Sequence, residues 1–140
     1  MKEPGMVYYI IVSVVSGIVF GVLDGLINAN PFGRRFLEVY KPIAKTSINV
    51  PIGIAIDLVY GFVLAGIFLL LYKSLPGEIG VVKGISFGIL TWFFRVVMSA
   101  ASNYMMFKIP IKTLQYTLLT GLGEMLILGV IYGFFLEPFK

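Results

Sequence analysis

Four long apolar segments dominate the sequence and limit what the chain can fold into. The segments are Met6–Ala29, Ile48–Tyr72, Gly80–Ser102 and Leu114–Leu136. A helix needs about 20 consecutive apolar residues to cross the hydrocarbon core of a bilayer, and each segment meets that length. Only 13% of the residues are charged, which is about half the share found in soluble domains. The sequence therefore predicts an all-α integral membrane protein, a four-transmembrane-helix bundle that forms a single domain over residues 1–140.

The connections between these segments carry turn and helix-start signals. Between the second and third segments, Ser74 to Gly77 includes a Pro-Gly pair and predicts a tight turn. After the first segment, Asn30 and Pro31 are typical of a helix start, with Asn as the N-cap and Pro at the first helical position. The apolar residues that follow share one helical face: Phe32, Phe36, Leu37 and Tyr40. We expect a short interfacial amphipathic helix here; a plain basic loop is the alternative.

The two halves of the chain resemble each other without a gap at a shift of 67 residues, the difference between positions 84 and 17. The matched residues that are not merely apolar are Gly17 with Gly84, Gly21 with Gly88, Lys41 with Lys108, Lys45-Thr46 with Lys112-Thr113, Asp57 with Glu124 and Gly66 with Gly133. This match predicts two tandem two-helix repeats, residues 7–73 and 74–140. Because each repeat holds two spans, both halves should insert the same way up and be related by a pseudo-two-fold axis along the membrane normal.

Small residues recur at helical spacing in every span. In a bilayer such residues let helix backbones approach closely. The glycines we assign to helix packing are Gly17, Gly21, Gly61, Gly84, Gly88, Gly129 and Gly133. Two alternatives stay open: a conduction path lined by glycine, and a contact of Gly129 and Gly133, which point away from Glu124, with a second protomer.

Four charged residues lie well inside the spans and need an explanation, namely Asp24, Asp57, Arg95 and Glu124. Each costs at least about 2.5–3.5 kcal/mol near the bilayer centre on insertion scales, so each must face a partner, water or another protein. All four lie toward the span ends that border the basic linkers, which predicts one polar cluster. We expect Arg95 to contact at least one of the three acids, and Asp24 and Arg95 to belong to a structural network.

Asp57 and Glu124 occupy matched positions of the two repeats and are the candidate ion or proton site. Two acids related by a pseudo-two-fold axis meet near that axis if both spans face inward. Burial and like-charge repulsion disfavour two ionised carboxylates side by side, so such a pair should hold a proton or bind a cation. A sealed structural network is the alternative role. Tyr60, one turn after Asp57, is expected to pack rather than to bind.

Several chemistries are excluded by composition. The chain has no Cys and no His, so disulfides, thiol nucleophiles, Cys/His zinc sites and His- or Cys-ligated haem are ruled out. It also lacks a phosphate-binding loop. We expect no cofactor, no metal site and no enzymatic activity. The net charge of +4 is small and scattered, and it favours anionic lipid headgroups over nucleic acid as partners.

The function expected from these features is transport- or channel-type, with Asp57 and Glu124 at the ion or proton site. The alternative is a non-catalytic structural or assembly subunit of a larger membrane complex, in which the glycine faces dock neighbours and the charges stabilise the fold. The expected partners are membrane lipids and either further copies of the chain or the subunits of such a complex. A hydrolase using paired acids is a third interpretation, but nothing supplies a nucleophile or a metal.

The distribution of basic residues predicts an orientation in the cell membrane. The linkers after the first and third spans carry six: Arg34, Arg35, Lys41, Lys45, Lys108 and Lys112. The opposite side carries four: Lys2, Lys73, Lys83 and Lys140. The positive-inside rule then places both linkers in the cytoplasm and both termini outside.

Overall fold

The computed structural model describes residues 5–44, 47 and 49–136, and none of these lies in a β-strand. Within them, four helical segments are long and apolar enough to cross a membrane. They are α1 (Met6–Ala29), α3 (Val50–Leu71), the continuous run of α4 (Gly80–Trp92), a π-helical turn (Phe93–Val97) and α5 (Met98–Met106), and α6 (Ile111–Phe135). The predicted all-helical, four-span architecture is therefore confirmed. The largest boundary difference is at Ser102, where the helix continues to Met106. Lys2, Lys45, Thr46, Ile48 and Lys140 lie outside the described residues.

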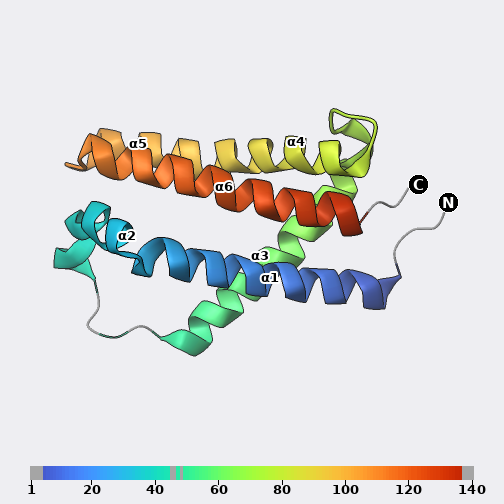
Figure 1. The fold of residues 1–140 in the computed structure, drawn as a ribbon, viewed down its shortest axis with the longest axis horizontal. Helices are drawn as coiled ribbons and strands as arrows, with labels where there is room; N and C mark the ends of the chain where they lie inside the picture. The colour runs from blue at the N-terminus through green and yellow to red at the C-terminus, as the bar shows by residue number, and fades with distance from the viewer. Residues whose placement is uncertain (1–4, 45–46, 48, 137–140) are drawn as a thin grey trace.

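The helices form two antiparallel pairs (Figure 1). α1 packs on α3, the α4–α5 run packs on α6, and a contact between α1 and α6 joins the pairs. α1 and α4 begin at the same end of the bundle and run in the same direction, and α3 and α6 return together. This parallel arrangement of two hairpins is what a tandem repeat requires. The duplication itself stays a prediction.

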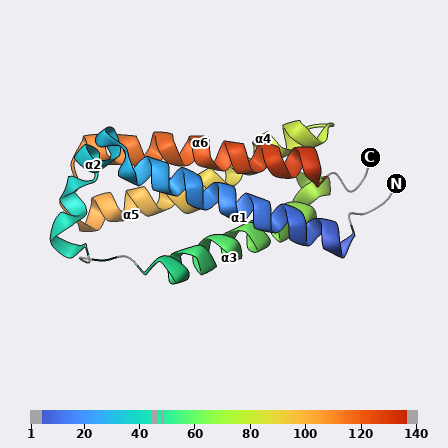
Figure 2. The same ribbon diagram turned by 60° about the horizontal axis from the view of Figure 1, so that its bottom comes forward.

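The linker after α1 begins as predicted but does not form one continuous helix. The Asn30 side chain accepts a hydrogen bond from Gly33 N at 2.8 Å, and Pro31 occupies the first turn of α2 (Pro31–Phe36). After Leu37 the chain continues as a 3₁₀ helix over Glu38–Ile43. Pro42 has no N–H to donate to the Glu38 carbonyl, so an α-helix cannot continue through it. α2 packs against the start of α6 (Figure 2).

Glycines bring the paired helices into backbone contact. A Cβ on Gly84 would overlap the Gly129 carbonyl of α6, and a Cβ on Gly61 would overlap the Ser13 carbonyl of α1. A Cβ would overlap another helix at every glycine assigned to packing, with its backbone or, for Gly21, with the Asp57 carboxylate: Gly17, Gly21, Gly61, Gly84, Gly88, Gly129 and Gly133. Gly129 and Gly133 face α4 of the same chain, so the alternative in which they face a second protomer is wrong.

An aromatic cluster forms the centre of the bundle on the side away from the linkers. Phe68 of α3 packs edge-on against Phe87 of α4, with ring centroids 5.4 Å apart, and lies 6.0 Å from the ring of Tyr132 on α6. The Tyr132 hydroxyl donates to Ser16 Oγ of α1 at 2.9 Å. All four long helical segments therefore meet at this cluster, which is closed to solvent.

The connection from α3 to α4 is a turn, as predicted, and it needs glycine at one position. Gly77 has φ +113°, a backbone conformation that residues with a Cβ rarely adopt. Lys83, which we counted among the basic residues on the side opposite the linkers, is buried in the first turns of α4. Its ammonium group donates to the carbonyls of Tyr72 at 2.7 Å and Leu75 at 2.8 Å. It thereby satisfies backbone acceptors at the C-cap of α3 and in the turn that follows.

Replacing Lys83 with Met is expected to lower the free energy of unfolding by about 2 kcal/mol, because hydrogen bonds from charged donors contribute roughly 1.5–3 kcal/mol. Met keeps the length of the side chain but removes the charged donor from both carbonyls, and the Tyr72 carbonyl then keeps a longer hydrogen bond from Leu75 N at 3.4 Å. Reversible unfolding in detergent, followed by far-UV circular dichroism, measures the change. The exposed Lys108, replaced in the same way, is the control and should unfold like the wild type. Equal stability of Lys83→Met and wild type would contradict this role.

Candidate functional site

Arg95 lies in the π-helical turn that separates α4 from α5. Turns of this kind insert an extra residue and occur frequently at functional sites. The turn directs the guanidinium into the bundle, where its carbon lies 4.9 Å from the ring centroid of Phe20 and 5.1 Å from that of Tyr60. Both distances suit cation–π interactions. Tyr60 therefore packs against the cation rather than hydrogen-bonding an acid.

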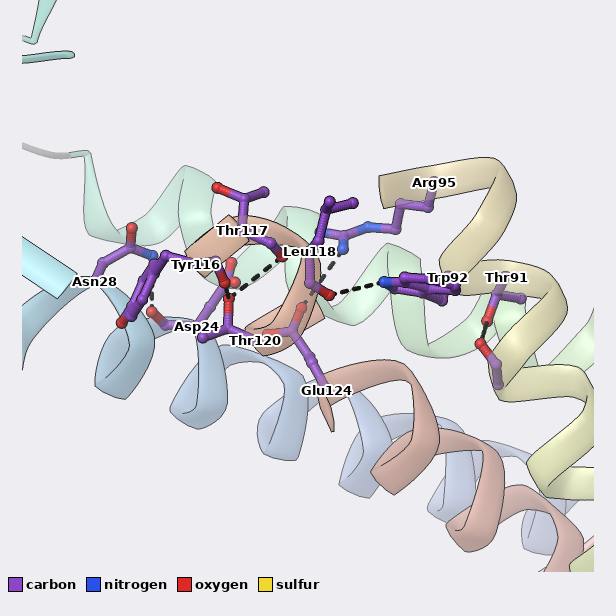
Figure 3. Close-up of polar contacts among 11 residues, drawn as sticks. Asp24, Asn28, Thr91, Trp92, Arg95, Tyr116, Thr117, Leu118, Thr120 and Glu124 are labelled. Atoms are coloured by element: carbon purple, nitrogen blue, oxygen red, sulfur yellow. Dashed lines mark hydrogen bonds and ion pairs between the residues drawn. The ribbon is translucent and has the colours of Figure 1, made fainter. Parts of the chain in front are cut away.

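Glu124 of α6 forms the ion pair with Arg95 (Figure 3). Arg95 Nη1 lies 3.5 Å from Glu124 Oε1, the arginine side chain is 30% exposed, and the glutamate side chain is 2% exposed. The prediction that Arg95 contacts one of the acids is confirmed. The contact is long, however, compared with the roughly 2.7–2.9 Å of a good charge-assisted hydrogen bond. Within the described part of the chain, Glu124 Oε2 and Arg95 Nε are buried and have no hydrogen-bond partner.

Asp24 of α1 faces the same place from the opposite side. It lies close enough to Glu124 for the two carboxylates to repel each other. Its backbone carbonyl accepts a hydrogen bond from the Asn28 side chain at 2.8 Å. Among the described residues the only partner of Arg95 in an ion pair is Glu124. Asp24 therefore acts on Glu124, through its charge and, when one of the two carboxyl groups carries a proton, through a hydrogen bond between them.

A polar pocket of about 250 Å³ adjoins these three charged residues at the linker end of the bundle. Besides Asp24, Arg95 and Glu124, its polar lining is Asn28, Tyr40, Tyr116, Thr117 and Thr120. We call this the polar pocket. A second pocket of about 290 Å³ shares Tyr40, Arg95, Val96 and Thr117 with it and lies toward α3 and α5. Each volume exceeds the roughly 30 Å³ that one water occupies in the liquid, so both sides of Arg95 can hold several waters.

Asp57 lies outside the polar pocket. It lines a mainly apolar groove between α1 and α3, and its carboxylate occupies the space that a side chain on Gly21 would fill. It is close enough to feel the charges of Asp24 and Arg95. The structure thus gathers all four intramembrane charges in one region. It does not place Asp57 and Glu124 in one pocket, and Asp24 occupies the position beside Glu124 that we expected for Asp57.

The register of the two helix pairs explains this placement. Gly17 packs against the Asp57 carbonyl and the Leu58 backbone, and Gly88 packs in the same way against Met125 and Leu126. In the face that it turns to the partner helix, position 125 in α6 therefore corresponds to position 57 in α3. The 67-residue shift instead pairs Gly17 with Gly84, and position 57 with Glu124. One residue turns a helical side chain by about 100°. Glu124 consequently points to the bundle interior, while Asp57 points to α1.

Tyr116 and Asn30 were not singled out as site residues in the sequence. The Tyr116 hydroxyl donates to the Ile27 carbonyl and accepts from Asn30 Nδ2, the latter at 2.9 Å. These bonds hold the end of α1 against α6 and form one wall of the polar pocket. The sequence did hold a signal for Tyr116, because this residue precedes Glu124 by about two helical turns and so shares its face.

Trp92 of α4 packs near this site. Its ring N–H donates to the Leu118 carbonyl of α6 at 2.8 Å.

The fold defines the class of this protein: an all-helical chain with four membrane-length apolar helices among its described residues. Comparisons with protein families, with curated proteins and with solved structures find no match. In the described residues no cluster of three or more acidic side chains has metal-site geometry. The function must therefore be argued from the residues around the polar pocket.

Proposed function

We propose that this chain is a small transport- or channel-type membrane protein whose ion or proton site is centred on Glu124. Asp24 and Arg95 complete the site, and Asp57 adds its charge from the neighbouring groove. One observation carries the proposal: the buried carboxylate oxygen Oε2 of Glu124 has no hydrogen-bond partner in the described structure, yet Glu124 lines a polar pocket. In a purely structural network that oxygen would have a hydrogen-bond partner within the protein. A bound proton or cation would supply the partner that is missing.

The charge balance supports the same conclusion. Asp24, Asp57 and Glu124 act on one another and on Arg95. If all of them were ionised, three negative charges would share one positive charge in a site of low polarity. Like charges in such a site disfavour full ionisation, so uptake of a proton or a small cation stabilises the cluster. Reversible uptake of that kind is what transport requires.

Access to the site differs between its two sides. The polar pocket reaches Glu124 from the linker end. On the other side, Phe68, Phe87 and Tyr132 are buried and fill the space between the helices. In this conformation the described residues leave the linker end open to an ion and close the opposite side. We infer that the aromatic cluster is the barrier that must rearrange for passage.

Flux measurements in liposomes test the proposal. Wild-type protein, reconstituted with a pH-sensitive dye inside the vesicles, should dissipate an imposed proton or sodium gradient. Glu124→Gln should reduce the flux to that of empty vesicles, because the amide keeps the shape of the side chain but cannot ionise. Asp57→Asn should reduce it less, and the double variant should match Glu124→Gln. Glu78→Gln, at an exposed acid in the turn before α4, is the matched control and should retain wild-type flux.

Two results would reject the proposal: no flux of any tested ion by the wild type, or undiminished flux by folded Glu124→Gln. The first would favour the alternative of a structural or assembly subunit. A specific feature supports that alternative: an apolar groove along the outer face of α3, lined by Ile52, Ile56, Val59 and Val63, which a helix of a further copy or of another subunit would fill. Cross-linking in native membranes distinguishes a lone chain from such an assembly.

The remaining architectural proposals concern symmetry and orientation. We propose that the α1–α3 and α4–α6 hairpins descend from a duplication and superpose by a rotation of about 180° around the membrane normal. The parallel course of the hairpins supports this (Figure 1). We also propose that α2 lies in the membrane interface and that the basic linkers face the cytoplasm.

A further inference from the structure

A further pocket, distinct from the two beside Arg95, lies between α2 and the first turns of α6. Its volume is about 620 Å³, and its lining includes Arg35, Phe36, Lys112, Gln115, Tyr116 and Leu119. Figure 2 shows α2 lying across the start of α6. The Thr113 hydroxyl donates to the Phe36 carbonyl, and the rings of Phe36 and Tyr116 are in tilted contact with centroids 5.3 Å apart. These contacts hold α2 and α6 together, so the walls are formed before any ligand arrives.

The charge of this pocket is entirely positive. Arg35 and Lys112 are both exposed, and no acidic residue lines the pocket. Within the described residues the ion pairs are Lys41 with Glu38 and Arg95 with Glu124, so neither cation of the pocket is neutralised by a carboxylate. The N-terminus of α6 adds a partial positive charge at the same place. The site is therefore suited to an anion.

The polarity of the pocket changes along α6. Lys112 lies in the first turn, Gln115 follows about one turn later, and Leu119 is 70% exposed one turn beyond that. Seven residues of helix span roughly 10 Å. The pocket therefore runs from a charged end beside the linker to an apolar end about two turns into α6. Phe36 lies beside this path. An anion with a hydrocarbon chain matches this gradient, and a free inorganic anion matches its charged end alone.

We propose that this pocket binds an anionic phospholipid, with the phosphate between Arg35 and Lys112, the ester region at the Gln115 amide and an acyl chain along Leu119 and Phe36. Basic pockets between membrane helices bind anionic headgroups in this way. The bound lipid would hold α2 against α6 at the linker end. The proposal stands on residues that the ion site does not use, apart from Tyr116, whose ring borders both pockets.

Native mass spectrometry of the purified, delipidated protein, titrated with defined lipids, tests the proposal. Phosphatidylglycerol should bind the wild type about 30-fold more tightly than phosphatidylcholine, because its net negative charge is attracted by two cations, Arg35 and Lys112. Arg35→Gln with Lys112→Gln should bind both lipids equally, and each single variant should lose about fivefold, half of the effect on the same logarithmic scale. Arg34→Gln with Lys108→Gln removes the same charge from the same end without touching the pocket and should keep the wild-type preference.

A competition experiment separates a lipid site from a phosphate site. Glycerol phosphate in large excess should leave bound phosphatidylglycerol in place, and Leu119→Asn should weaken phosphatidylglycerol binding. Displacement by glycerol phosphate would overturn the assignment of a lipid. An unchanged lipid preference in the Arg35 and Lys112 variants, or an equal loss in the Arg34 and Lys108 control, would overturn the site itself. Thermal unfolding of each variant confirms that binding is compared between folded proteins.

Discussion

Arg95→Leu is expected to lower the free energy of unfolding by about 3 kcal/mol, at the lower end of the range for breaking a buried ion pair. The low end applies because the Arg95 side chain keeps 30% exposure while Glu124 is almost fully buried. The loss arises because Glu124 would be left in the bundle beside Asp24 without a counter-charge. The cation–π contacts of the guanidinium with Phe20 and Tyr60 would be lost as well.

A double replacement makes this test specific. Arg95→Leu combined with Glu124→Leu removes both charges, and replacing a whole buried pair with apolar residues is often neutral or stabilising. The double variant should therefore be more stable than Arg95→Leu alone. Arg34→Leu, at an exposed arginine of α2, controls for the change in residue type. Chemical unfolding in detergent provides the free energies. If Arg95→Leu matches the wild type, or if the double variant is the less stable of the two, the pair does not stabilise the bundle in this way.

Local sequence signals predicted the elements of this fold well. The apolar lengths located the four spans, the Asn30–Pro31 pair marked the start of α2, and the Pro-Gly pair marked a turn in which Gly77 has a positive φ. Each of these depends on a few neighbouring residues. The need of Arg95 for an acid could also be predicted, because the cost of an unpaired charge in hydrocarbon does not depend on the details of packing.

The choice of acid depended on helix register, which the sequence left ambiguous. Gly84 and Gly88 are one turn apart and offer two similar positions for α6, so both registers satisfy the same small-residue pattern. The sequence match pairs Gly17 with Gly84, whereas in the structure Gly88 makes the contacts with α6 that Gly17 makes with α3. A similar limit applies to the π-helical turn at Arg95 and to the burial of Lys83, because both follow from how distant segments pack and not from any local motif.

Gly129→Leu is expected to destabilise the protein by about 3 kcal/mol, the upper part of the range for overpacking. Gly129 sits where α4 and α6 are in backbone contact, and even a Cβ there would overlap the Gly84 carbonyl. Side-chain rotation cannot relieve an overlap with backbone, so the helices must separate. That separation would loosen the pair that carries both Arg95 and Glu124, and ion flux should fall together with stability.

Gly123→Leu on the same helix is the matched control for this prediction. No atom outside its own helical turn lies within 4 Å of a Cβ placed on Gly123, and the residue is exposed. There the replacement removes the helix penalty of glycine, which is about 1 kcal/mol, and adds an apolar side chain to the outer surface. Gly123→Leu should therefore unfold at or above the wild-type midpoint, and Gly129→Leu well below it. Equal midpoints for the two variants would mean that α4 and α6 are not held in backbone contact in the membrane protein, and the placement of Glu124 beside Arg95, which follows from that contact, would have to be abandoned with it.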